Sequence, residues 1–310
     1  TPNEELIRKY YLYYLKSDFF QKKLISVSAR GAQNGFNKEG IYDFDVPVPP
    51  IEEQKEIVEI LDQAFESIEK AKTNIEKNIE NAKELFKSKL NQIFSQTGDD
   101  WKEHALNDVC QKITQGPNPK LRNDIPSENN FILKTKDFYN HKIYYQKCDR
   151  ISDSLIKEWE RFTLEEDDFI IGLVGVGSIG KSNLFKNQKG KKFIFTRATG
   201  LIRTNKELLN PQFLRFFFLS GLGISMINKG IGGTTGQLVI KTSYLKSLKI
   251  NIPKSIDIQN KIIEEINTVD NHIQSLLLIY EEELKNLEEL KKSIHLKAFS
   301  GELTNKNKAA

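Results

Sequence analysis

The chain has 310 residues, of which 38% are apolar and 28% charged, with a formal net charge of +4. This composition is typical of a folded protein long enough for two or more domains, with an unusually polar surface. Two cysteines without a CxxC pair and four scattered histidines argue against a disulfide framework and against common metal motifs. No apolar run reaches membrane-spanning length and the first residues do not form a signal peptide, so we expect a cytoplasmic protein.

Charge is distributed unevenly along the chain. Lys181–Arg203 contains seven basic residues and no acidic one, whereas Glu52–Lys70 contains seven acidic and two basic residues. A basic region suits phosphates, and an acidic helix does not. The pattern therefore allows either a nucleic-acid-binding domain joined to helices that face protein, or ordinary solvated surface in both segments.

Residues 1–48 come first and contain the aromatic segment YYLYYLKS at 10–17. An apolar, strand-like stretch then ends at Pro49 and Pro50, just before a helix start, where a missing backbone N–H costs nothing. From Leu61 to Ile93 the apolar residues recur at steps of three, four and seven, which keeps them on one face. Neither glycine nor proline interrupts them, so residues 49–97 are predicted to form one long helix.

The next segment, residues 98–252, is predicted to be a mixed α/β domain. Asn210 and Pro211 predict the start of a short aromatic helix that runs to Ser220. The domain opens with residues 101–109, and a strand at 242–253 closes it. Between them, three segments have strand character: 131–138, 167–180 and 191–204.

A second long helix is predicted over residues 253–303, before a short tail at 304–310. Its apolar positions from Ile266 to Ala298 again follow steps of three, four or seven. At about 1.5 Å per residue each helix would be roughly 67 Å long, so its apolar stripe needs an equally long partner. We expect the two helices to form a coiled coil, interrupted at Lys72, Lys89, Asp270 and Lys291. Two unrelated surface helices are the alternative.

The two helices belong to an internal repeat, which favours their pairing. Pro49 recurs as Pro253, 204 positions later, and Gln54 recurs as Gln259, 205 positions later. KSKLNQIFS at 87–95 recurs as KSIHLKAFS at 292–300, and YYLYYLKS resembles FLRFFFLS at 213–220. The second copy is whole, whereas roughly 110 residues of the first would precede Thr1. Residues 1–48 are therefore interpreted as the C-terminal part of a first domain.

One motif suggests nucleotide binding. GVGSIGKS at 175–182 fits the pattern GxxxxGK[ST], but a phosphate-binding loop needs a helix after it. Residues 183–196 lack a helical stripe, contain Gly190 and return to β-branched and aromatic residues, which predicts a hairpin. Nucleotide hydrolysis is thus the less favoured alternative. The chain also lacks the Asn/Asp-Pro-Pro-Tyr motif of amino-methyltransferases and a histidine-based triad.

The order of motifs resembles the specificity subunit of type I restriction–modification enzymes. The matching motifs are Pro-Pro-Ile-x-x-Gln at 49–54 with its echo Pro253…Gln259, ILKTKDF at 132–138, GSIGK at 177–181, NPQFLRFFF at 210–218 and KAFSGELT at 297–304. The resemblance implies α/β (α+β) target-recognition domains and two long helices that form an antiparallel coiled coil.

That resemblance also implies a function without catalysis. Each recognition domain would bind one half of a split site in double-stranded DNA, and the helices would set the spacing. The subunit would hold two methyltransferase (M) subunits and, through them, the restriction/translocase (R) subunits. S-adenosylmethionine, ATP and Mg²⁺ would serve the holoenzyme, with no cofactor site in this chain. A structural coiled-coil adaptor that recognises no bases is the alternative.

Glycine-rich polar loops of the whole domain are the candidate DNA contacts, because they allow close backbone approach. Arg197 and Gln237 are predicted to contact bases, and the lysines to contact phosphates. Each residue could instead belong to ordinary surface or to loop hydrogen bonding. The candidates are Thr114, Gln115, Asn118, Lys134, Lys136, Ser178, Lys181, Arg197, Thr234, Thr235 and Gln237.

Overall fold

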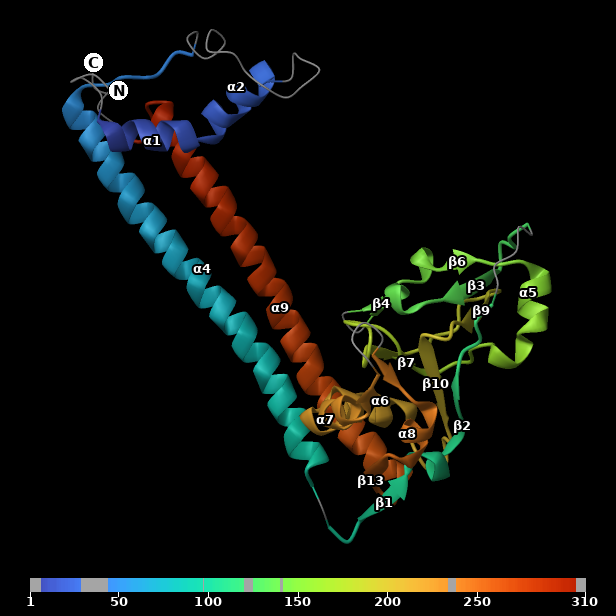
Figure 1. Cartoon of the computed structure of the whole chain (residues 1–310). Coiled ribbons are helices and arrows are strands. Elements are labelled where there is room, and N and C mark those ends of the chain that lie inside the picture. Colours follow the sequence, from blue (N-terminus) through green and yellow to red (C-terminus); the bar gives the residue numbers. More distant parts are fainter. Residues whose placement is uncertain are drawn as a thin grey trace. The chain divides into compact units, whose positions relative to one another are not determined.

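The computed structural model describes residues 7–28, 44–96, 98–119, 125–139, 142–233 and 238–304. The chain divides into two compact units (Figure 1). Unit 1 comprises Thr1–Lys83 with Ile273–Ala310, and unit 2 comprises Glu84–His272. The division falls inside two long helices, α4 (Ile51–Phe94) and α9 (Ile256–Phe299).

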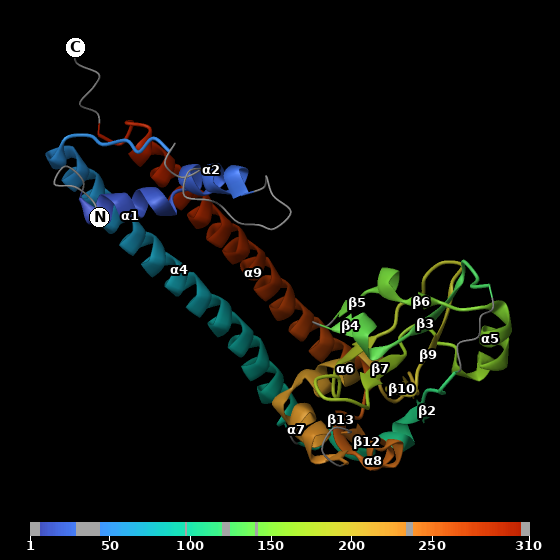
Figure 2. The same ribbon diagram turned by 45° about the horizontal axis from the view of Figure 1, so that its top comes forward.

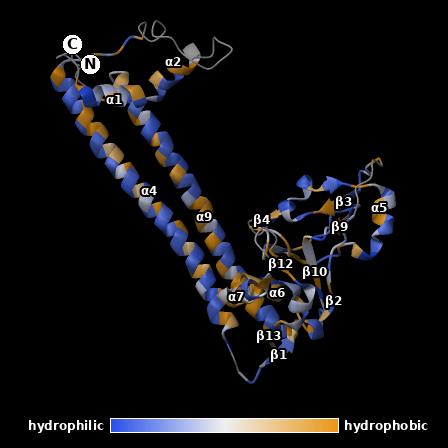
Figure 3. Cartoon of the chain, in the orientation of Figure 1, coloured by the Kyte–Doolittle hydropathy of each residue, from blue (hydrophilic) through white to orange (hydrophobic). Residues whose placement is uncertain are grey.

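Both long helices form as predicted, with 44 residues each. They lie side by side and antiparallel (Figures 1 and 2), and Figure 3 shows apolar and polar residues interspersed along both. The predicted stripes are the less exposed positions, and Leu61, Ile68 and Ile273 are buried. The fold is therefore mixed α/β with an antiparallel coiled coil.

The lysines that interrupt the stripes are paired across the coil. Lys72 Nζ lies 3.4 Å from Glu288 Oε1, and Lys291 Nζ lies 2.9 Å from Glu69 Oε1. In unit 2, Lys89 Nζ lies 2.6 Å from Glu265 Oε1. In each pair the ammonium belongs to one long helix and the carboxylate to the other. The three lysine breaks in the periodicity are thus interhelical ion pairs, each of modest strength because it is partly solvated.

Unit 1 adds two short helices, α1 (Arg8–Lys16) and α2 (Asp18–Ser28), to the ends of α4 and α9. Tyr10 and Tyr14 of α1 are buried and meet the ring of Phe299, with ring centroids 5.3 and 5.4 Å apart. Gln54, fully buried in the first turn of α4, accepts from Ile7 N and donates to Pro49 O, both at 2.8 Å. These contacts tie the start of one long helix and the end of the other to α1.

Unit 2 repeats this junction with its own residues. Gln259 of α9 accepts from Asn210 N at 2.9 Å and donates to Pro253 O at 3.2 Å. Phe94, near the end of α4, packs on Phe213 and Phe217 of helix α6 (Pro211–Leu219), with centroids 5.1 and 5.6 Å apart. The anchors of the sequence repeat are therefore the residues that build two equivalent junctions.

Short strands form the rest of unit 2. A four-stranded antiparallel sheet has the order β2-β10-β7-β8, and a three-stranded sheet, β6-β3-β9, pairs β3 with β9 in parallel. The remaining pairs are β1-β13, β4-β5 and β11-β12. The strands are β1 (Trp101–Ala105), β2 (Cys110–Gln115), β3 (Asn130–Leu133), β4 (Phe138–Tyr139), β5 (Lys142–Ile143), β6 (Asp149–Arg150), β7 (Phe169–Gly172), β8 (Ser182–Leu184), β9 (Lys192–Phe195), β10 (Thr199–Thr204), β11 (Ile231–Gly232), β12 (Val239–Ile240) and β13 (Lys249–Pro253).

The four-stranded sheet separates two hydrophobic cores. Phe169 and Ile171 of β7 face one core with Phe213 and Phe217, whereas Ile170 between them faces the other. Because strand side chains alternate between faces, a strand buried on both sides reads as a continuous apolar run. The first core is covered by α6, α7 (Gly221–Lys229) and α8 (Thr242–Ser247), and the second by α5 (Asp153–Glu158).

Several expectations about unit 2 need correction. Residues 242–253, predicted as a strand, form helix α8 and then β13. The hairpin expected over 183–196 is instead made by β7 and β8, and β9 leaves to pair with β3. The segment 131–138 breaks after β3 because the Asp137 carboxylate accepts from Lys134 N at 2.8 Å, which forms a 3-10 turn, η2 (Thr135–Asp137). The aromatic helix begins as predicted, with Asn210 accepting from Gln212 N.

Candidate nucleic-acid interface

The end of β2 and the turn between β9 and β10 bring two candidate residues together. Gln115 Nε2 donates to the backbone oxygen of Arg197 at 2.7 Å, and Gly116 N donates to Thr199 O at 3.0 Å. A Cβ at Gly116 would lie only 2.4 Å from Thr196 O, so only glycine permits this approach. The Gln115 side chain is thus occupied in holding the turn, and the Arg197 side chain projects from it, exposed.

A third segment, the end of β3, packs against the same turn between β9 and β10, and we call this part of unit 2 the edge. Thr196 N donates to Leu133 O at 3.2 Å, which places Lys134 and Lys136 directly after the contact. Both ammonium groups contact Asp149, Lys134 at 2.6 Å and Lys136 at 3.4 Å. The hydrogen bond from Lys134 lowers the pKa of the Asp149 carboxyl group, which therefore stays ionised. One carboxylate is thus shared by two of the predicted phosphate contacts.

The glycine-rich loop between β7 and β8 lies beside these segments. It is a hairpin loop in which Gly175, Gly177 and Gly180 have φ values of 102°, 70° and 78°, which favour glycine. Lys181 leads directly into strand β8 and not into a helix, so the loop lacks the strand–loop–helix geometry of a phosphate-binding loop. A Cβ placed on Gly172 of β7 would lie 2.0 Å from Ser178 O and 3.6 Å from Thr135 Cγ2, so the loop and η2 both approach this glycine.

The remaining candidates lie around this edge or outside the described residues. Thr114 is half-buried in β2, and Asn118 is exposed after it. Thr234, Thr235 and Gln237 lie outside the described residues. The chain beside them nevertheless returns to the edge, because Gly175 N donates to Leu238 O at 3.0 Å. The structure therefore brings Gln115, Lys134, Ser178 and Arg197, which are far apart in sequence, into neighbouring loops.

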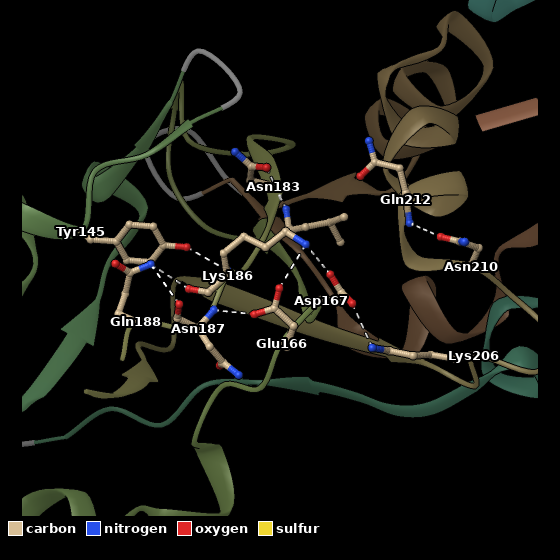
Figure 4. Close-up of polar contacts among 11 residues, drawn as sticks. Tyr145, Glu166, Asp167, Asn183, Lys186, Asn187, Gln188, Lys206, Asn210 and Gln212 are labelled. Atoms are coloured by element: carbon tan, nitrogen blue, oxygen red, sulfur yellow. Dashed lines mark hydrogen bonds and ion pairs between the residues drawn. The ribbon is translucent and has the colours of Figure 1, made fainter. Parts of the chain in front are cut away.

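The basic stretch from Lys181 to Arg203 is partly neutralised by carboxylates that precede it. Arg203 forms a two-point ion pair with the buried Asp168, both contacts 2.7 Å. Asp167, at a φ of 71°, lies between Lys186 at 2.6 Å and Lys206 at 2.9 Å (Figure 4). The charges of Lys186 and Arg203 are therefore partly neutralised, because strand pairing brings them to carboxylates that lie outside the basic stretch.

Two other basic side chains at this edge carry no such neutralisation. Among the residues that the structure describes, no carboxylate lies within ion-pair distance of Arg197 or Lys181. An unpaired guanidinium on a rigid turn can donate two hydrogen bonds to the O6 and N7 acceptors of guanine in the major groove. The arrangement is chemically suited to base recognition by Arg197.

Sequence reasoning missed one cluster beside this edge. Tyr139 and Tyr144 stack with ring centroids 4.2 Å apart, and the ammonium of Lys147 lies over both rings. The signal was present in the run KDFYNHKIYYQK at 136–147, where aromatic and basic residues alternate. It gave no prediction because Tyr139 and Tyr144 meet only after the chain turns back at the β4-β5 pair.

Within the described part of the chain, no helix is long and apolar enough to cross a membrane. The same residues contain no group of three or more His, Cys, Asp or Glu side chains arranged to hold a metal ion. Both cysteines are free, and burial raises the pKa of each thiol to about 12.

Comparison with known proteins adds an independent observation. The family model of the type I restriction modification DNA specificity domain matches residues 1–81 and 98–286. The specificity subunit of the type I restriction enzyme StySPI from Salmonella potsdam is 23% identical over 322 residues, which cover 98% of this chain and 67% of the relative. The EcoKI specificity subunit of Escherichia coli is 22% identical over 315 residues, with the same two coverages of 98% and 67%. The chain thus spans about two thirds of the length of these relatives.

Two solved structures share the fold. A chain from a type I R-M system, solved to explain complex assembly and conformational transition, superposes with a TM-score of 0.78 at 18% identity, covering 95% of this chain and 71% of that chain. The HsdS subunit from Thermoanaerobacter tengcongensis gives a TM-score of 0.60 at 18% identity, with coverages of 96% and 71%. At this identity the likeness concerns the fold alone.

Proposed function

The chain belongs to the family of type I restriction modification DNA specificity domains, and we propose that it is the DNA recognition subunit of a type I restriction–modification complex. Unit 2 recognises one half of a bipartite site in double-stranded DNA. The antiparallel helices α4 and α9 hold methyltransferase subunits, and restriction/translocase subunits join through these.

One observation carries the proposal for unit 2. Loops that are distant in sequence meet at a single edge, and Arg197 projects from it on a turn fixed by the hydrogen bonds of Gln115 and Gly116. A turn held in place loses little conformational entropy when its arginine contacts a base. Lys181, on the neighbouring loop, is placed to contact the phosphate backbone.

The chain itself takes no part in the chemistry under this proposal. S-adenosylmethionine, ATP and Mg²⁺ act on the partner subunits. The loop at 175–182 fits ATP poorly, because its lysine leads into strand β8 and not into a helix whose N-terminus would bind the phosphates. The predicted Lys181 contact is therefore with DNA phosphates.

The proposal is tested by selecting binding sites from random duplex DNA with the chain co-expressed with a methyltransferase subunit of its own genome. Selection of one short motif by the wild-type complex, and its loss in Arg197→Ala, is the expected result. A complex that forms but selects no motif would favour the alternative, a coiled-coil adaptor without base recognition. Failure to co-purify with any such methyltransferase would contradict the role as its subunit.

A further inference from the structure

A small aromatic and basic cluster projects from unit 2 on the two-stranded ribbon β4-β5 and the turn η3 (Tyr145–Lys147) that follows. The rings of Tyr139 and Tyr144 stack nearly in parallel, at 18° and 4.2 Å between centroids. Lys147 Nζ lies 5.2 and 5.0 Å from these centroids and donates to the Tyr139 hydroxyl at 2.8 Å. We refer to Tyr139, Tyr144 and Lys147 as the tyrosine clamp.

The clamp lies on the outer side of a ribbon whose inner side is anchored in the core. Phe138 is 1% exposed and Ile143, its partner across the ribbon, packs against the same core. The next pair, Tyr139 and Lys142, faces the other way, as alternation along a strand requires. Tyr144 N donates to Asp137 O at 2.8 Å, which fixes the turn that carries the second ring. The clamp is therefore held rigidly without being part of the core.

Its positive charge has no carboxylate partner among the residues that the structure describes. The nearby Asp149 is occupied by Lys134 and Lys136, and Asp137 is buried and accepts from Lys134 N. The hydrogen bond to Tyr139 raises the pKa of Lys147, so the ammonium remains charged at neutral pH. From Lys134 to Arg150 the sequence contains four Lys or Arg residues besides Lys134 itself and two acidic ones, which leaves this surface basic.

An ammonium held beside two stacked phenol rings, in contact with a hydroxyl group, has the chemistry of a phosphate contact. Both the ammonium and the hydroxyls donate hydrogen bonds, and each ordered donor lowers the entropic cost of binding. The clamp follows η2 directly in the chain, and Thr135 of η2 lies near Gly172 of β7, beside which Ser178 of the candidate interface also packs. A duplex whose bases meet Arg197 would present its backbone to neighbouring basic groups of unit 2.

We propose that the tyrosine clamp binds a backbone phosphate of the DNA next to the half-site, with Lys147 as the charged contact and the tyrosine hydroxyls as additional donors. This proposal rests on the DNA-binding function proposed above and adds a positioning contact to it. The clamp fixes the orientation of the duplex on unit 2 and carries no base specificity of its own. The stacked rings serve to hold the ammonium in place.

The test measures the salt dependence of binding to a random-sequence duplex of about 30 base pairs, because removing one phosphate contact lowers the slope of log K against log salt by about 0.9. Lys147→Gln is expected to lower the affinity about threefold to tenfold at low salt and the slope by about one. Lys246→Gln, the same change at an exposed position on α8, is the matched control and should leave the slope unchanged. Thermal unfolding confirms that each variant is folded.

Tyrosine variants distinguish phosphate binding from base stacking. Tyr144→Phe keeps the ring and removes the hydroxyl, so a phosphate contact predicts a loss of affinity of about twofold to fivefold. If Tyr144→Phe and Lys147→Gln both bind as the wild type does while Tyr144→Leu binds weakly, the clamp stacks on a base and the proposal is wrong. An unchanged slope for Lys147→Gln also overturns it. If the wild-type chain shows no salt-dependent binding, the proposed function itself fails.

Discussion

Replacing Gln259 by methionine tests whether the buried glutamine is what holds the helix start to the aromatic helix in unit 2. Gln259 is fully buried, accepts from Asn210 N at 2.9 Å and donates to Leu208 O and Pro253 O at 2.9 and 3.2 Å. Methionine has a similar length and cannot donate a hydrogen bond. The variant therefore leaves three backbone groups without their partner while nearly preserving the packing.

The expected cost follows from which of these groups water can reach. Leu208 is 46% exposed, so its carbonyl can be hydrated, whereas Pro253 is buried and Asn210 is partly buried. Two unsatisfied groups cost about 1–3 kcal/mol each, and the gain from burying an apolar side chain offsets about 1–2 kcal/mol. We expect Gln259→Met to lower the free energy of unfolding by about 1–4 kcal/mol.

Tryptophan fluorescence during urea unfolding suits this measurement, because Trp101 and Trp159 both lie in unit 2. Hydrogen exchange adds a local readout, since the Asn210 amide should lose protection. Gln92→Met on the exposed face of α4 is the matched control, and its unfolding free energy should stay within about 0.5 kcal/mol of the wild type. A Gln259→Met transition that coincides with the control, with the Asn210 amide still protected, would refute the reasoning.

Three further changes test other parts of the structure. Arg197→Ala should weaken binding to the selected site by about 1–3 kcal/mol, measured by fluorescence anisotropy; equal methylation of that site by both complexes would contradict base contact. Lys181→Ala should leave ATP binding by the isolated chain unchanged and lower the slope of log K for DNA binding against log salt concentration by about one. A loss of ATP binding would support the phosphate-loop interpretation. His295 is 8% exposed, and burial, with Lys291 and Lys16 nearby and Asp18 opposing them, lowers its pKa. The unfolded chain then binds the proton more tightly, so stability should decline as the pH falls below about 6.5. His295→Leu should weaken that decline in urea unfolding at about pH 5 relative to pH 7.5, and an unchanged pH dependence would exclude His295 as its source.

The long helices were predictable because their information is local. A stripe at steps of three, four and seven specifies a helix wherever its partner lies, and Pro49 and Pro253 mark both starts. The segment at 242–253 failed because its apolar residues, Leu245 and Leu248 among them, suit a buried helix turn as well as a strand. Short apolar runs do not distinguish the two.

The contacts among the candidate residues and their charge balance were not predictable from the sequence. Arg197 lies within the segment 191–204, which was expected to be strand-like, and its hydrogen bond with Gln115 depends on the pairing of β10 with β2. The same sheet brings Asp168, just before β7, to Arg203 on β10, which partly neutralises the basic stretch. Pairings between distant strands set both outcomes, and no local pattern specifies them.

Each junction is built from both copies of the repeat, and this explains why the repeat has its anchors at the two ends of the helix. Unit 1 combines the start of α4, through Gln54, with the end of α9, through Phe299. Unit 2 combines the start of α9, through Gln259, with the end of α4, through Phe94. Neither copy of the strand–helix unit can complete a junction alone. Each long helix begins in one junction and ends in the other, so every junction needs the start of one helix and the end of the other. The antiparallel pairing of α4 and α9 is therefore a structural requirement of both units.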